Sequence, residues 1–160
     1  MSRVRRFIAG IALSLTAGGL AQAQTATQSV GIQVQSIDQI TVAGAPSLVI
    51  NAAVAGSQPT QATASGTYAI TTNDTSRIVT VEIDNDMPAN TLLKITMAAP
   101  TGGTSAGAIT LSSTPQNAVT GFGMVIGSGL AIGYTLDATV AAGLIASTSR
   151  TVTFTIIAGP

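Results

Sequence analysis

The sequence predicts an all-β protein, a single antiparallel β-sandwich or jelly roll of about ten short strands behind a cleaved signal peptide. Three observations predict this class. Apolar and polar residues alternate with a period of two along most of the chain, clusters of Gly, Pro, Ser, Asn and Asp separate these runs, and no amphipathic helical pattern occurs. Hydrophobic residues make up 46% of the 160 residues and charged ones only 8%, a composition that argues against intrinsic disorder.

The first residues have the pattern of an export signal. Three arginines among the first six residues precede an apolar run, Phe7–Ala17, and the small-residue sequence Ala21-Gln22-Ala23 follows. This pattern predicts a secretory signal peptide over residues 1–23 and a single domain over 24–160. The apolar run is too short for a membrane span, so we expect none in the mature chain. We therefore expect an exported protein, extracellular or at the cell surface, with the periplasm as the other open compartment.

The alternating runs predict the strands of the sandwich, and loops of small and polar residues separate them. A hairpin is expected between 68–72 and 77–83, around Asn73 and Asp74. In chain order, the predicted strands centre on Val30–Val34, Ile40–Val42, Leu48–Ile50, Tyr68–Ile70, Val79–Ile83, Leu93–Met97, Ile109–Leu111, Phe122–Ile126, Leu130–Leu136 and Val152–Ile156.

One further hairpin is predicted in register. A three-residue loop, Gly127-Ser128-Gly129, would pair Ile126 with Leu130 and place all large side chains of both strands on one face. Gly129 suits the left-handed conformation that such a loop requires. The opposite face would then be a strip of small residues. Two interpretations of that strip are open: a packed or solvated sheet face, or a surface that a second subunit or a flat ligand approaches closely.

The residue types argue against catalysis and against nucleic-acid binding. The chain has no His and no Cys, which excludes Ser/His/Asp and Cys/His arrangements and the usual zinc ligands. Lys94, its only lysine, is expected on the polar face of a strand. Carboxylate pairs remain, but aromatic residues make up only 3% of the chain and offer little to hold a sugar. Residues 24–160 contain three basic against six acidic residues, so no basic patch for nucleic acid is expected. We predict that the protein is not an enzyme.

The densest polar cluster is a candidate calcium site. It contains Glu82, Asp84, Asn85 and Asp86, and the predicted hairpin would bring Asn73-Asp74 nearby. Calcium binds six to eight oxygen ligands, often from Asp and Asn in loops. The other interpretation is that these residues cap a strand end and form Asx turns. No other cofactor is expected.

The segment directly after the predicted cleavage site, residues 24–36, is an alternating strand at a free terminus. Val30, Ile32 and Val34 are its apolar residues, and it carries no charge. Either it is the first strand of its own domain, or it is donated to the next subunit, where it completes a sheet. Donation of this kind does not close on itself and so propagates as a filament. The low charge also fits an assembling sheet protein, because charged side chains normally protect strand edges.

The layout resembles known families of exported subunits. An N-terminal strand follows the cleavage site directly, and a Cys-free, Thr/Ala/Gly-rich β-domain ends on the strand Arg150–Ile157. This resembles the jelly-roll subunits of camelysin and TasA-type matrix fibres and of archaeal bundling pili, and more distantly WxL surface domains, although the chain has no Trp. The resemblance implies polymerisation by strand donation in a biofilm or pilus-like filament. The metalloprotease activity described for camelysin is not implied, because the chain lacks His.

These observations lead to two functional hypotheses. The first is a non-enzymatic structural subunit of an extracellular filament or surface layer, with a homo-oligomer as its product. The second is a monomeric secreted or cell-surface binding or adhesive module, stabilised by calcium at Asp84 and Asp86. They differ in whether residues 24–36 act within their own domain or in association with another copy. Neither hypothesis names a small-molecule or glycan ligand.

Overall fold

The computed structural model describes residues 23–160. The predicted signal peptide lies outside the described residues, except for its last residue. The chain divides into two units after Gln33. Residues 23–33 contain no helix or strand, and the second unit, residues 34–160, contains every strand of the described part.

The second unit is all-β, as predicted. Its described residues form nine strands and one short 3-10 helix, η1. The elements are β1 (Asp38–Ala43), β2 (Ala62–Thr72), β3 (Arg77–Ile83), β4 (Thr91–Met97), β5 (Thr104–Ser105), β6 (Ile109–Thr110), β7 (Gln116–Phe122), β8 (Val125–Ala138), η1 (Val140–Ala142) and β9 (Val152–Ala158).

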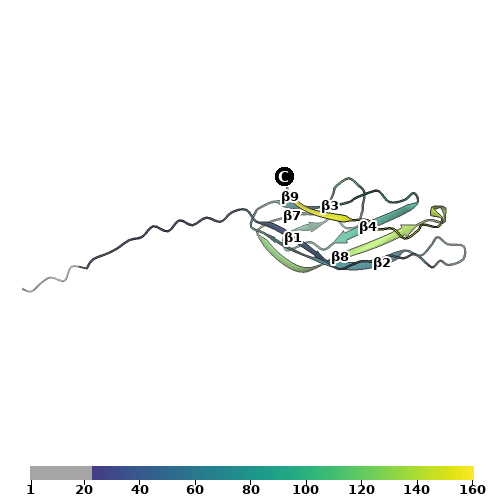
Figure 1. The fold of residues 1–160 in the computed structure, drawn as a ribbon, viewed down its shortest axis with the longest axis horizontal. Coiled ribbons are helices and arrows are strands. Elements are labelled where there is room, and N and C mark those ends of the chain that lie inside the picture. The colour runs from purple at the N-terminus through teal and green to yellow at the C-terminus, as the bar shows by residue number, and fades with distance from the viewer. Residues whose placement is uncertain (1–22) are drawn as a thin grey trace, which may run out of the picture. The chain divides into compact units, whose positions relative to one another are not determined.

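The strands form two antiparallel sheets (Figure 1). One sheet has the order β1-β2-β8-β4-β6, and the other has the order β5-β7-β3-β9. From β2 to β9, successive strands alternate between the two sheets, so each connection crosses from one sheet to the other. Apart from β1 with β2, no strand therefore pairs with the strand that directly precedes or follows it in the chain.

The core lies between the two sheets, where each contributes one apolar face. Ile70 and Ile132 come from the first sheet, and Val79 and Phe122 come from the second; all four are almost fully buried. Tyr68 and Tyr134 bring hydroxyl groups into this core, and the hydroxyl of Tyr68 donates a hydrogen bond to the backbone oxygen of Ala98. Burial raises the pKa of Tyr68 to about 12, so this donor keeps its proton at physiological pH.

The predicted hairpin around Gly127–Gly129 is wrong, because β8 runs without a turn through these residues. Gly129 does adopt a positive φ of 64°, but in a bulge of β8, where Tyr68 pairs with Leu130 and Ile70 with Gly127. The extra residue shifts the phase of the alternation, so Ile126 is 82% exposed while Ile132 is buried. Phe122 belongs to the other sheet.

The other predicted hairpin is also wrong. β2 and β3 lie in different sheets, and the residues between them form the crossing. Asn73 and Asp74 come before the start of β3, whereas Asp84 and Asp86 follow its end. A seven-residue strand therefore separates the two acidic groups that the prediction placed together.

Two of the predicted strands have no partner. Val30–Val34 and Leu48–Ile50 alternate as a strand does, but they pair with nothing in the described part of the chain. β5, in contrast, lies between two of the predicted strands, where Thr104 and Ser105 pair with Thr120 and Val119.

Candidate functional site

The N-terminal segment, residues 24–36, exposes its apolar side chains. Val30, Ile32 and Val34 have exposed fractions of 75%, 94% and 83%. Every residue from 23 to 37 is exposed, and none of them lies in a strand or helix. The segment therefore has the alternation of a half-buried strand, but no surface of the described chain buries its apolar side chains. Strand donation to another copy stays a prediction.

Asn73 holds the end of this segment where the chain enters β1. Its side-chain oxygen accepts a hydrogen bond from the backbone N–H of Ile37 at 2.8 Å, and its amide donates one to the backbone oxygen of Gln35 at 2.8 Å. The backbone N–H of Asn73 also donates to the backbone oxygen of Ile37 at 3.2 Å. The side chain of Asn73 thus continues the β1–β2 ladder beyond its last pair, Asp38 with Thr72.

An ion-pair cluster adjoins Asn73. The guanidinium of Arg77 pairs with the carboxylates of Asp38 and Asp74, and its Nε lies 3.0 Å from Asp38 Oδ2. The hydroxyl of Ser36 donates a hydrogen bond to Asp74, and that of Thr72 donates one to Asp38 at 2.7 Å. We call these residues, together with Asn73, the clasp. The clasp fastens residues 35–38 to the crossing between β2 and β3.

Hydrogen bonding in the clasp stabilises the ionised form of Asp74. The hydroxyl of Ser36, together with the hydrogen bond and the charge of Arg77, lowers the pKa of Asp74, although partial burial opposes this shift. The C-terminus reaches the same end of the sandwich, because Ser76 Oγ donates to the backbone oxygen of Pro160 at 2.7 Å. The clasp is thus a fixed, charged end of the molecule.

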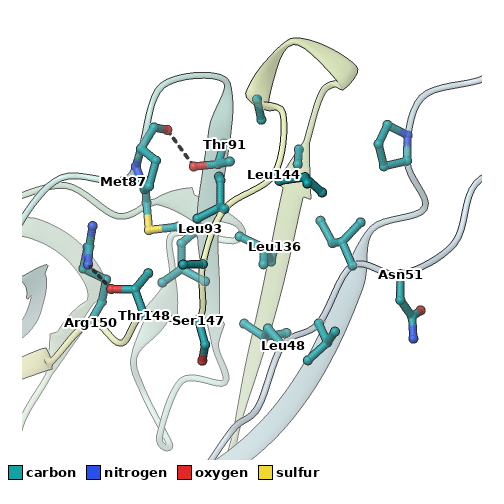
Figure 2. A pocket seen from close by; sticks show the side chains of 18 of the residues that line it. Leu48, Asn51, Met87, Thr91, Leu93, Leu136, Leu144, Ser147, Thr148 and Arg150 are labelled. Carbon is teal, nitrogen blue, oxygen red and sulfur yellow. Dashed lines mark hydrogen bonds between the residues drawn. The ribbon is translucent and has the colours of Figure 1, made fainter.

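A cleft opens at the other end of the sandwich (Figure 2). Its volume is about 1020 Å³, and two loops, residues 46–53 and 139–151, form its walls. Leu93 of β4 and Leu136 of β8 line its interior, and Figure 2 shows Leu48 and Leu144 on the loops around them. These side chains make the cleft an apolar gap that reaches the core between the sheets.

The walls of the cleft have unpaired backbone. Within the described part of the chain, the backbone groups of residues 45–51 and of 144–148 form no hydrogen bond. The Val140 N–H of the 139–151 loop donates to Gln58 Oε1 at 2.9 Å, outside the wall formed by residues 46–53. Leu48 and Ile50 are half-buried and Val49 is exposed, so residues 48–50 have the side-chain alternation of a strand without a ladder.

Arg150 is the charged residue of the cleft lining. Its two terminal nitrogens donate to Thr148 Oγ1, to the backbone oxygen of Ser149 and to that of Asp86. Its Nε is buried, and among the described residues it has no hydrogen-bond partner. An unpaired buried N–H is costly, so an acceptor supplied from outside would be favourable here.

Of the predicted calcium residues, Asp84, Asn85 and Asp86 lie in the loop after β3, and the carboxylates of Asp84 and Asp86 accept hydrogen bonds from backbone groups. Asp84 Oδ1 accepts from the N–H of Asn85 at 2.9 Å and from that of Thr151 at 3.1 Å. Asp86 Oδ1 accepts from the N–H of Ser113 at 2.7 Å, and this bond lowers the pKa of Asp86. Glu82 lies on β3, in register with Thr153. The residues from 23 to 160 contain no group of three His, Cys, Asp or Glu side chains placed to hold a metal ion.

Sequence reasoning missed both the clasp and the cleft. Asn73, Asp74 and Arg77 form the clasp with residues 36–38, about forty positions earlier in the chain. The cleft combines two loops separated by some ninety positions. The strand-like alternation at Leu48–Ile50, which has no partner strand, is the one signal in the sequence that points to the cleft.

Comparison with known protein families, with curated proteins and with solved structures gave no match for this chain. In residues 23–160, no helix has both the length and the apolar character needed to cross a membrane.

Proposed function

We propose that this protein is a non-enzymatic structural subunit of an extracellular filament or surface layer, which assembles by donating residues 24–36 to a neighbouring copy. The observation that carries the proposal is the exposure of Val30, Ile32 and Val34 on an uncharged segment without a ladder partner. Burial is worth about 1.5–3 kcal/mol for each such side chain, so three of them form a substantial driving force for association.

The remaining features agree with an assembling subunit. Sequence residues 1–23 have the pattern of a secretory signal, which fits export before assembly. The alternation of successive strands between two sheets from β2 to β9 fits a jelly roll, in which Greek-key connections cross the sandwich. We propose a jelly-roll classification on this basis.

Electron microscopy and light scattering of the secreted protein test the proposal. We expect regular filaments and a mass far above that of one chain. Ile32→Asp should leave the protein monomeric, because it places a charge on the apolar edge of the segment. Gln33→Asp is the matched control, since it adds the same charge at the neighbouring polar position, and it should still assemble. A wild-type protein that stays monomeric at all concentrations would overturn the proposal.

The alternative is a monomeric binding or adhesive module, stabilised by calcium at Asp84 and Asp86. One observation favours it: the volume of the cleft, about 1020 Å³, lies at the upper end of the range typical of small-molecule sites, about 300–1,000 Å³. The same sample distinguishes the two functions. A monomer whose Tm rises on addition of calcium and falls with a chelator would support the alternative.

A further inference from the structure

We infer that the cleft between residues 46–53 and 139–151 is the acceptor for the N-terminal segment of a second copy of this chain. The segment would lie beside residues 46–50 and place Val30, Ile32 and Val34 against the apolar interior of the cleft. This inference rests on the proposed function and adds to it the surface that receives the strand.

The two surfaces match in chemical character. Residues 24–36 contain no charged side chain and alternate small polar with apolar residues. The cleft is lined mainly by apolar and small side chains, and Leu48, Leu93 and Leu136 are prominent among them. Entry of the segment would therefore bury apolar surface on both sides without burying an unpaired charge.

The two surfaces also match in backbone hydrogen bonding. Within the described residues, both the N-terminal segment up to residue 34 and the wall at 45–51 have free backbone N–H and C=O groups. Strand addition pairs such groups while pockets receive alternate side chains. An inserted backbone would also bring carbonyl oxygens into the cleft, where Arg150 Nε lacks an acceptor.

The positions of the clasp and the cleft favour a contact between copies. The clasp holds residues 35–38 beside the start of β3 and the end of β2. The cleft lies beside the start of β4, the end of β8 and the start of β9, at the opposite end of the antiparallel strands. Donor and acceptor at opposite ends give a head-to-tail contact, and such a contact propagates rather than closing on itself.

Among the four edge strands, β5 and β6 are only two residues long, so β1 and β9 are the alternative acceptors, and both are weaker than the cleft. β1 and β9 are edge strands, but they lie beside each other and close that flank of the sandwich. A strand added along Val42 or Ile157 would lie outside the cleft, whose lining includes neither residue. Val42 of β1 and Ile157 of β9 are half-exposed, and they mark these edges for the experiment.

Mixing two full-length variants tests the assignment. Ile32→Asp blocks donation and leaves the cleft intact, whereas Leu48→Asp blocks the cleft and leaves the donor intact. Each variant alone should be monomeric by light scattering, and an equimolar mixture should form a heterodimer of twice the monomer mass. Val42→Asp, on the β1 edge, is the matched control and should form filaments like the wild type. Filaments from Leu48→Asp alone would overturn the assignment.

Disulfide mapping covers the case in which Leu48→Asp does not fold. The chain has no native cysteine, so single substitutions give an unambiguous result. Chains with Val30→Cys, Ile32→Cys or Val34→Cys are mixed with chains carrying Leu48→Cys, Val42→Cys or Ile157→Cys and then oxidised. We expect at least one donor position to cross-link to Leu48→Cys at more than ten times the yield at the two edges, since a disulfide needs Cα atoms within about 7 Å.

The outcomes distinguish failure of the acceptor assignment from failure of the proposed function. Filaments with cross-links at Val42→Cys or Ile157→Cys would keep the proposed function and overturn the cleft as its acceptor. A double variant, Ile32→Cys with Leu48→Cys, that closes only within one chain would show that the segment fills its own cleft and would also overturn it. A small molecule that co-purifies in the cleft and stays there in wild-type filaments would also overturn the cleft as the acceptor. An absence of any assembly would remove the proposed function itself.

Discussion

The two ends of the sandwich differ in how far their backbone groups are hydrogen-bonded. At the clasp, Asn73 extends the β1–β2 ladder, and Arg77 binds two carboxylates from separate segments. At the cleft, residues 45–51 and 144–148 have no backbone partners within the described part of the chain, and the lining is mostly apolar. Ion pairs therefore fix the chain at the clasp, whereas the lining of the cleft contains one charged side chain, that of Arg150.

This difference concerns which end of a sheet protein with few charged side chains is fixed and which end stays open. Polar contacts at the clasp fix the point from which the N-terminal segment leaves the domain. The open end keeps apolar side chains and free backbone groups together, which is the combination that strand addition uses. The comparison predicts that the same substitution has different effects at the two ends.

The largest expected effect compares two positions on the inner face of β8. Ile132 is 1% exposed in the middle of the core, and Ile132→Ala should lower the free energy of unfolding by about 2–5 kcal/mol. Leu136 is half-buried at the cleft, so Leu136→Ala should cost less than half as much in the monomer. Urea titration of both variants in the Ile32→Asp background measures this difference. Equal losses would mean that the cleft end is packed as tightly as the centre.

A smaller effect tests the left-handed conformation of Gly129 in the bulge of β8. Gly129 has a φ of 64° with open space around its Cβ position, so Gly129→Ala should cost about 1–2 kcal/mol through backbone strain alone. Gly133 also faces open space but has no positive φ, and Gly133→Ala is the matched control. We expect the control to be neutral or to stabilise the protein by about 0.5–1 kcal/mol. Similar losses at both positions would contradict the bulge.

The bulge also shows which features of the strands can be predicted from sequence alone. Period-two alternation predicted most of the strands, including β3, β4 and β9, because these strands have one face in the core. It placed Ile126 on the wrong face, since the extra residue at Gly129 shifts the phase in a way that alternation cannot indicate. Gly129 itself was correctly expected to be left-handed, because the demand for a positive φ is local.

Strand pairing was harder to predict than strand position. Both predicted hairpins assumed that neighbouring strands pair, which is the usual arrangement. Here successive strands from β2 onward lie in different sheets, and a local pattern does not specify which sheet receives a strand. For the same reason, the clasp and the cleft were not predicted as sites. Arg77 meets Asp38 only because β1 and β3 end up in facing sheets.

The smallest expected effect concerns the pH dependence of the clasp. The pKa of Asp74 in the folded protein lies below its ordinary value of about 4, because Ser36 and Arg77 stabilise the carboxylate. A lowered pKa means that this contribution to stability is fully present above about pH 4 and is lost as the pH falls through the folded-state pKa. Asp74→Asn should therefore lower the Tm at pH 6, and its difference from the wild type should shrink below pH 4.

Asp137→Asn is the control for this measurement. Asp137 pairs with Lys94 at 2.8 Å on the outer face of the sheet, and both side chains are about one-third exposed. Asp74 is similarly exposed, at 29%, but it also accepts a hydrogen bond from Ser36, and its partner Arg77 is only 16% exposed. Asp137→Asn should therefore differ less from the wild type at pH 6. If Asp74→Asn stays below the wild type by the same margin down to pH 2, the ionised carboxylate is not what holds the clasp. The fixed end would then depend mainly on Asn73, whose amide hydrogen bonds do not titrate.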